Sequence, residues 1–235
     1  MSAYEGFAQD AWHPVEISDH VRRGEVTLGF LVEQELALWR SASGAVHVWA
    51  NCCAHRSVRL TLGLIDNDTL VCRYHGWRYG TDARCVVIPA HPGVAPPKAA
   101  CAKAYSSFER DGVVWASLGE PAEEPPALPE GATYCRSHVV ALPPARFMQL
   151  APEAGFVMRH PQWLDATDAV HDGAMVTLVQ PIGPQRTGVH VFALGAKGEH
   201  ASEGDRQAAA AAFRTALRKW QDLAQKEATT ETAHA

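Results

Sequence analysis

The sequence lacks several features that would mark common classes of protein. In its 235 residues, no apolar run approaches the ~20 residues that a membrane-spanning helix needs. Basic residues are not in excess, since 21 Lys and Arg stand against 26 Asp and Glu, so we predict no nucleic-acid surface. The N-terminal stretch is polar and acidic, without a signal-peptide pattern. We therefore expect a cytoplasmic protein that binds neither membranes nor nucleic acid.

Cysteine is scarce, and its distribution is uneven. The chain has six cysteines, which we expect to be reduced in the cytoplasm unless they bind metal. Cys85, Cys101 and Cys135 stand alone, and we expect them to be small buried residues. The other three lie in one short segment, residues 51–77, which reads "NCCAHRSVRLTLGLIDNDTLVCRYHGW".

Residues 10–118 are rich in short β-type segments. The stretch "GEVTLGFLVEQELALWRSASGAVHVWAN" alternates such segments with turn residues, and "RDGVVWASLG" places a further strand behind an Asp-Gly turn. Little of this region has helical periodicity. Many short strands with little helix predict an all-β barrel or sandwich.

The composition changes at residue 119. Residues 119–131, "GEPAEEPPALPEG", contain four prolines and four glutamates without periodicity, which predicts an exposed linker. Residues 132–228 then predict a small α+β region that contains a strand, a hairpin around a Gly-Pro turn and a helix at about 205–228. One face of that helix carries Phe213, Leu217, Trp220 and Ala224, and residues 229–235 are expected to form a flexible tail.

Two cysteines and two histidines form two short pairs, Cys53-Ala-His55 and Cys72-Arg-Tyr-His75, with sixteen residues between them. Structural zinc sites usually use Cys-Cys and His-His pairs, whereas each pair here mixes the two residue types. A centre with two irons fits the mixture better, because two thiolates can bind one iron and two imidazoles the other. Zinc remains the alternative metal.

The spacing C-x-H-x16-C-x2-H, followed by Gly76 and Trp77, resembles the Rieske [2Fe–2S] motif. More closely, "CAHRS…LTLG…LVCRYHGWRYGTDARCVVIP" resembles the N-terminal domain of Rieske non-haem iron oxygenases, which include ring hydroxylases and oxidative demethylases. The resemblance covers about residues 10–118. It implies that Cys53, His55, Cys72 and His75 bind the cluster through one Cys-bound and one His-bound iron.

Three details separate this sequence from its relatives. Cys52 could replace Cys53 as a ligand, but the family places its cysteine two residues before the histidine. Family members usually have glycine where Ser57 stands, so a positive φ there would cost stability. Respiratory-chain members have a disulfide at the positions of Val58 and Tyr74, so the resemblance favours the oxygenase branch and a potential of roughly −150 mV.

The residues around the motif suggest two further roles. Trp77 and Tyr79 are either ordinary barrel core or a dry shell that raises or lowers the potential of the cluster. The segment 52–85 contains five arginines against three aspartates, either as an ordinary solvated surface or as a basic patch that steers an acidic ferredoxin or reductase. The arginines are Arg56, Arg59, Arg73, Arg78 and Arg84, and the aspartates are Asp66, Asp68 and Asp82.

A complete Rieske oxygenase also has a mononuclear iron held by two histidines and one carboxylate. Its motif resembles N-x2-D-x2-H-x4-H, and "LDATDAVHDGAMV" supplies Asp165, Asp168 and His171 at matching positions. Asp165 replaces the asparagine, and Val176 replaces the second histidine. Asp168 and His171 are therefore weak candidates for a catalytic site, and a mononuclear Fe(II) is doubtful.

The remainder of the chain resembles the closing hairpin and helix of such a catalytic domain. Asp222 and Glu227 are the candidates for the third iron ligand, and His138, His160 and His190 could supply a missing one only in a rearranged site. The region beyond the linker is also about half as long as the family usually has. We interpret it as a shortened helix-grip domain with an incomplete iron triad.

These features support two hypotheses. In the first, the chain carries electrons from an NAD(P)H-dependent reductase or ferredoxin to an iron site on an oxygenase catalytic subunit. In the second, it is a small self-contained Rieske oxygenase, a hydroxylase or demethylase whose iron site includes Asp168 and His171. A decayed oxygenase is a third interpretation. The resemblance implies a trimer or a mixed oligomer, and it does not identify a substrate.

Overall fold

The computed structural model describes residues 2–160, 163–166, 175–195 and 199–233. The chain divides into two compact units. The first unit spans Gln9–Pro125, and the second contains the residues up to Ala8 together with Pro126–Ala235. The division lies inside the segment 119–131, between two consecutive prolines. Within that segment Leu128 is buried, so the prediction of a wholly exposed linker was wrong at this position.

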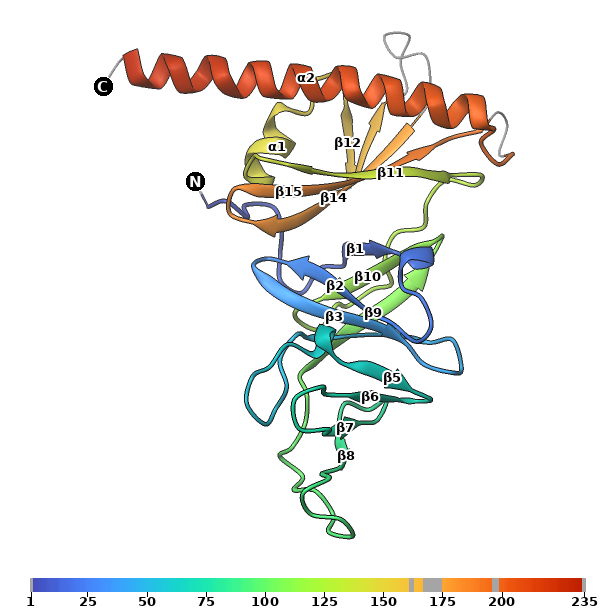
Figure 1. The fold of residues 1–235 in the computed structure, drawn as a ribbon. Coiled ribbons are helices and arrows are strands. Elements are labelled where there is room, and N and C mark those ends of the chain that lie inside the picture. The colour runs from blue at the N-terminus through green and yellow to red at the C-terminus, as the bar shows by residue number, and fades with distance from the viewer. Residues whose placement is uncertain (1, 161–162, 167–174, 196–198, 234–235) are drawn as a thin grey trace. The chain divides into compact units, whose positions relative to one another are not determined.

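The first unit is all-β, as predicted. One sheet has six strands in the order β1-β10-β9-β4-β3-β2, and a second sheet has four strands in the order β5-β6-β7-β8 (Figure 1). Two short 3-10 helices, Ser18–His20 and Leu60–Leu62, lie between strands. The strands are β1 (His13–Ile17), β2 (Val26–Leu31), β3 (Gln34–Arg40), β4 (Val46–Ala50), β5 (Leu64–Asp66), β6 (Thr69–Val71), β7 (Arg78–Tyr79), β8 (Cys85–Val87), β9 (Ala104–Arg110) and β10 (Val113–Ser117).

Local sequence explains the hairpins of this unit. Asp111 and Gly112, which join β9 to β10, have φ values of 53° and 73°, and this two-residue geometry favours Asp-Gly in tight hairpins. Large aromatic side chains from strands of both sheets fill one core of this unit. Trp39, Trp49 and Tyr79 are fully buried there and contact one another at ring edges.

The second unit places a sheet against helices. Its five strands have the order β11-β15-β14-β13-β12, and the long helix α2 packs on β15 and β11 (Figure 1). The hairpin β14–β15 and α2 confirm the elements predicted at the end of the chain, whereas α1, β12 and β13 were not predicted. The elements are β11 (Thr133–Val140), α1 (Pro144–Leu150), β12 (Val157–His160), β13 (Trp163–Ala166), β14 (Met175–Gly183), β15 (Arg186–Ala193) and α2 (Glu203–Ala233).

A hydrogen-bonded cap at its N-terminus and the packing of its apolar face stabilise helix α2. Ser202 Oγ accepts the Asp205 backbone N–H at 3.2 Å while the Asp205 carboxylate accepts the Ser202 N–H at 2.8 Å, a reciprocal cap. Trp220 stacks on Phe147 of α1 at 4.3 Å and donates to the Phe147 carbonyl at 3.0 Å. The helix continues to Ala233, and the flexible tail predicted for residues 229–235 stays a prediction. In the part of the chain that the structure describes, no helix combines the length and apolarity needed to cross a bilayer.

One histidine lies where α2 meets the sheet. His138 on β11 places its ring 5.1 Å from that of Phe213 on α2. Its Nε2 atom is buried and has no hydrogen-bond partner among the described residues. Burial lowers the pKa of His138, and the neighbouring charges of Arg136 and Arg214 lower it further. The folded state therefore favours the neutral imidazole.

We expect the second unit to lose stability as the pH falls below the ordinary histidine pKa of 6.5. Above that value the imidazole is neutral in both states, whereas below it the unfolded chain takes up a proton that the folded chain resists. Thermal unfolding, followed by helical circular dichroism at about pH 7.5 and about pH 5.5, measures the effect. His138→Leu should reduce the pH dependence, and an unchanged dependence would contradict this origin.

Candidate metal centre

The two Cys/His pairs lie on two neighbouring loops of the first unit. The first loop follows β4, and the second joins β6 to β7. Cys53 and Cys72 are 3% and 2% exposed and belong to the apolar core that the large aromatic side chains fill. His55 and His75 are exposed, and their Nδ1 atoms lie 3.0 Å apart. The fold thus brings together all four side chains that the sequence singled out, with sulfur inside and imidazole outside.

The backbone of the two loops is the same at equivalent positions. In each loop the cysteine N–H donates to the carbonyl five residues later, and the cysteine carbonyl accepts the N–H four residues later. The distances are 2.9 Å for Cys53 N to Val58 O, 2.9 Å for Ser57 N to Cys53 O, 2.8 Å for Cys72 N to Trp77 O and 3.0 Å for Gly76 N to Cys72 O. Two matching turns therefore present two cysteines to one core.

This turn requires a positive φ at the residue four positions after each cysteine. Gly76 has a φ of 70°, and Ser57 has a φ of 53°. A Cβ atom on Gly76 would lie 3.0 Å from Pro89 Cγ, so glycine also makes room there. The prediction that Ser57 occupies a position suited to glycine is confirmed, because a side chain in this region is strained.

The environment of the four side chains fits a metal cluster. Burial raises the pKa of the Cys72 thiol, and the adjacent Cys53 thiol raises it further. Such thiols retain their protons until a metal replaces them. Local desolvation lowers the pKa of His55, as do His75 and Arg56, and this favours the neutral imidazole that binds metals. The four side chains form two pairs, and within the described residues no group of three or more potential ligands surrounds one point.

Two aromatic residues contact this site directly. The Tyr79 hydroxyl lies 3.1 Å from Cys53 Sγ, and burial raises the pKa of Tyr79, so the phenol stays protonated and can donate to the sulfur. Trp77 stacks on His55 with ring centroids 4.6 Å apart and planes 7° apart. Both residues pack as core, as interpreted from the sequence. The sequence carried no signal for the contact between the hydroxyl and the sulfur.

A polar brace, which the sequence did not reveal, holds the first loop. Glu35 on β3 accepts Arg59 Nε at 2.8 Å and Asn51 Nδ2 at 3.1 Å through the same carboxylate oxygen. Asn51 Oδ1 accepts the backbone N–H of Thr61 at 2.8 Å. Both ends of the loop that contains Cys53 are thereby tied to one carboxylate.

An apolar hollow of about 260 Å³ lies beside the second loop. Val58 and Tyr74 line it, together with Leu62 and Arg73. The resemblance places a disulfide of the respiratory branch at Val58 and Tyr74, and the structure indeed brings these two positions to one hollow. Valine and tyrosine leave the hollow open where a disulfide would join the two loops.

The basic patch is smaller than the sequence suggested. Three arginines are opposed by carboxylates: Arg59 pairs with Glu35, Arg78 with Asp66, and Arg84 with Asp82. Arg56 and Arg73 are exposed and have no carboxylate partner among the described residues. Each directly follows one of the four pair residues, so each loop carries one unopposed positive charge. Of the isolated cysteines, Cys85 is buried as predicted, Cys135 is half-buried and Cys101 is exposed, which the prediction missed.

The second iron motif does not assemble in the described residues. Asp168 and His171 lie outside them. Asp165 and Val176 pair across the antiparallel strands β13 and β14, and Val176 is fully buried. The Asp165 carboxylate accepts Arg159 Nε at 2.9 Å and also the indole N–H of Trp163. Asp165 and Val176, the first and last positions of the motif, are therefore both part of the paired strands of the sheet.

The other candidate ligands are dispersed. His190 is buried on β15, where Nδ1 contacts Ser137 Oγ at 2.7 Å and Nε2 contacts Gln180 Oε1 at 3.2 Å. His160 is half-buried at the end of β12, and His138 packs on Phe213. Asp222 is exposed on α2, and the side chain of Glu227 lies outside the described residues.

Comparison with known proteins finds relatives of the first unit. Residues 11–98 match the Rieske [2Fe–2S] domain family. The chain is 39% identical over 123 residues to oxidoreductase NdmD of Pseudomonas putida, and this region is 52% of the chain and 21% of NdmD. It is 40% identical over 116 residues to the oxygenase component of chloroacetanilide N-alkylformylase of Rhizorhabdus wittichii, which is 49% of the chain and 32% of that relative. Each sequence match therefore spans about half of this chain and a third or less of the relative.

Solved structures extend the likeness to the fold of nearly the whole chain. NdmA of Pseudomonas putida CBB5 matches with a TM-score of 0.71 at 18% identity, over 92% of this chain and 81% of NdmA. Dicamba monooxygenase matches with a TM-score of 0.65 at 15% identity, over 93% of this chain and 99% of that chain. At such low identity, the likeness shows a common fold and the predicted fold class is confirmed.

The strained serine yields a stability prediction. Ser57→Gly should raise the free energy of unfolding by roughly 0.5–1 kcal/mol, because glycine adopts a positive φ without steric cost. Thermal unfolding of the metal-loaded protein measures the change. Ser57→Ala is the matched control, since it removes the hydroxyl and keeps the Cβ, and it should bring no gain. A glycine variant that is less stable than the parent would contradict this prediction.

Proposed function

We propose, from the match of residues 11–98 to the Rieske [2Fe–2S] domain family, that the chain is an oxidoreductase that passes single electrons through a cluster bound by Cys53, His55, Cys72 and His75. The arrangement of these four side chains is the observation that supports the proposal most strongly. The thiols are buried, and the exposed imidazoles have Nδ1 atoms 3.0 Å apart. When bound, the cluster supplies one-electron redox chemistry.

The protein's own residues have distinct parts in this function. The two buried cysteines would hold the cluster on the side of the apolar core. The two histidines leave their outer ring edges at the surface, so that an electron can enter or leave there. The Tyr79 hydroxyl donates to Cys53 Sγ, and a hydrogen bond to a ligand sulfur favours the more negative, reduced state.

Electron transfer to another chain is the role we favour. The residue at the position of the second iron histidine is Val176, which is fully buried and has no metal-binding atom. The carboxylate of Asp165 is held by Arg159 and Trp163. The cluster site thus has a complete ligand set, whereas the motif for an oxygen-activating iron lacks one of its histidines.

The partners that we propose follow from this role. The donor is an NAD(P)H-dependent reductase or a ferredoxin, and the acceptor is an oxygenase catalytic subunit, in a trimer or a mixed oligomer. Several relatives have names that imply such systems: one is an oxygenase component, one an iron–sulfur subunit of a monooxygenase system, and one an oxygenase subunit. Those names describe those proteins, and they support a multicomponent setting for this one.

A self-contained oxygenase is the second candidate. Its fold likeness to NdmA and to dicamba monooxygenase, over 92% and 93% of the chain, favours it. In that case Asp168 and His171 would hold an iron together with a ligand that the sequence motif does not identify. The two candidates differ in iron content and in what the chain does alone.

The ligand assignment predicts the behaviour of cysteine variants. Cys53→Ala and Cys72→Ala should each abolish the visible absorbance of the cluster and destabilise the loops, because a thiolate that joins the loop to iron is lost. Cys52→Ala is the matched control and should keep the cluster, since Cys52 is exposed and outside the core. A bleached Cys52→Ala variant with an intact Cys53→Ala variant would reverse the assignment.

The two unopposed arginines predict a salt-dependent reaction with the donor. Arg56→Gln and Arg73→Gln should each slow reduction by an acidic plant-type ferredoxin by about three- to tenfold at low ionic strength and flatten its salt dependence. Arg84→Gln, whose native charge is opposed by Asp82, is the control and should change little. Stopped-flow reduction at several salt concentrations provides the test. A flat salt profile for the parent protein would exclude steering by this surface.

Iron content and a substrate assay separate the two candidate functions. A carrier should contain about two irons for two sulfides, whereas an oxygenase should contain about three irons. Supplied with reductase, NADH, oxygen and aromatic or N-methyl substrates, the chain alone should accept electrons without forming product. Product formation that His171→Ala abolishes would replace the carrier proposal with the oxygenase.

A further inference from the structure

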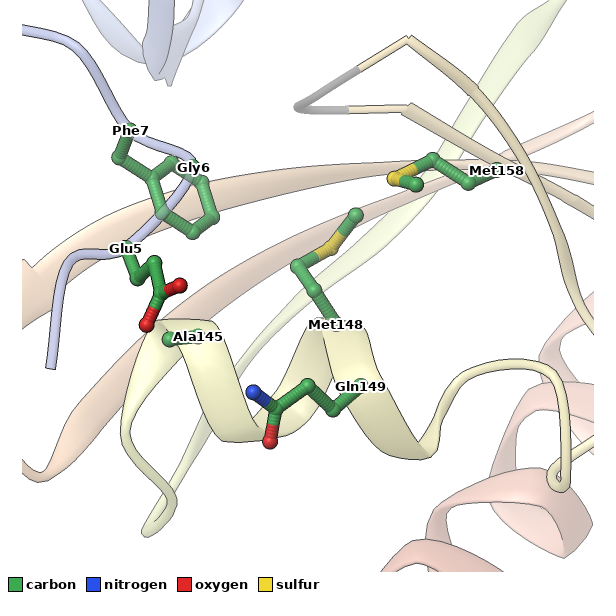
Figure 2. A pocket seen from close by; sticks show the side chains of 7 residues that line it. All are labelled: Glu5, Gly6, Phe7, Ala145, Met148, Gln149 and Met158. Atoms are coloured by element: carbon green, nitrogen blue, oxygen red, sulfur yellow. The ribbon is translucent and has the colours of Figure 1, made fainter. Parts of the chain in front are cut away.

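A pocket in the second unit lies outside the cluster site and is not used by the function proposed above. It has a volume of about 340 Å³, within the range of small-molecule sites. Three separate segments form it: the N-terminal residues, helix α1 and edge strand β12. Figure 2 shows Met148 and Met158 extending from α1 and β12 toward the same space, with Phe7 and Glu5 on the N-terminal segment.

The walls of the pocket are apolar and adaptable. Phe7 and Ala145 are buried and form its fixed part. Met148 is half-buried, and Met158 is 60% exposed although its side chain is apolar. Flexible thioethers fit irregular shapes and make favourable contacts with aromatic rings. An aromatic group that covered Met158 would remove its apolar surface from water.

The polar residues at the rim of the pocket favour a positively charged ligand. Glu5 is the charged residue among those that line it, and it is exposed. No ion pair of the Glu5 carboxylate occurs within the described residues. The other polar residue, Gln149, accepts a hydrogen bond from Arg146 Nη1 at 2.9 Å. An unopposed carboxylate beside an apolar wall attracts a cation that carries an apolar body.

We propose that this pocket binds small arylalkyl amines in their protonated form. The aromatic ring lies between Met148 and Met158 against Phe7, and the ammonium group lies toward the Glu5 carboxylate. Amine binding at this pocket requires neither the cluster nor the proposed electron transfer. Either proposal can therefore be disproved while the other holds.

The methionines of the chain allow a direct test. There are four, and of these Met175 is fully buried in the core beneath α2, away from the lining of the pocket. The protein is labelled with [13C-methyl]methionine, kept with its cluster oxidised and titrated with 2-phenylethylamine. The methyl resonances of Met148 and Met158 should shift in a saturable manner, and that of Met175 should stay in place. The absence of any shift at Met148 and Met158, or an equal shift at Met175, would overturn the site.

The charge preference is tested with matched ligands and variants. 2-Phenylethanol has the same size and no charge, and it should bind about threefold or more weakly than the amine, the modest gain expected of an exposed carboxylate. Glu5→Gln should remove that difference. Met158→Lys should weaken amine binding, whereas Val139→Lys, at an exposed strand position outside the pocket, should not. Equal binding of amine and alcohol to the parent protein would overturn the assignment to cations.

Discussion

Two thiols buried in an apolar core constrain most of the first unit. Cys53 and Cys72 belong to the core that large aromatic residues from both sheets fill, and burial raises the pKa of Cys72. A pair of ionised sulfurs in such a place is unfavourable unless metal ions neutralise it. A metal bound by these sulfurs would make the loops and the aromatic core depend on it, because the core positions the sulfurs and the metal would permit them to be charged there.

Backbone geometry fixes the conformation of the two loops that contain Cys53 and Cys72. The same two hydrogen bonds recur in both loops, and both require a positive φ four residues after the cysteine. Glycine meets this requirement in one loop, and a strained serine meets it in the other. The brace from Glu35 to Arg59 and Asn51 restrains the loop that contains the serine. Local strain is thus retained where several other contacts determine the conformation.

The second unit shares its fold with NdmA and dicamba monooxygenase, and one of its segments is used in sheet pairing. Asp165 and Val176 stand where the resemblance places iron-binding motif residues, and here they face each other across two strands. Helix α2 covers the sheet through Phe213 and Trp220, which are fully buried. The same unit has a pocket lined by two methionines and a carboxylate.

The sequence by itself predicted the metal centre, and it determined the all-β first unit and the closing hairpin and helix. Ligand identity and spacing are local properties, and so are the Asp-Gly turn at 111–112 and the helical recurrence of Phe213 and Trp220. The linker boundary and the ligand assignments at the cluster stay predictions. Only the tertiary structure decided which groups meet across the chain. The Tyr79 hydroxyl reaches Cys53, and Glu35 and Asp66 oppose Arg59 and Arg78, because the fold joins residues whose separation in sequence carries no periodic signal.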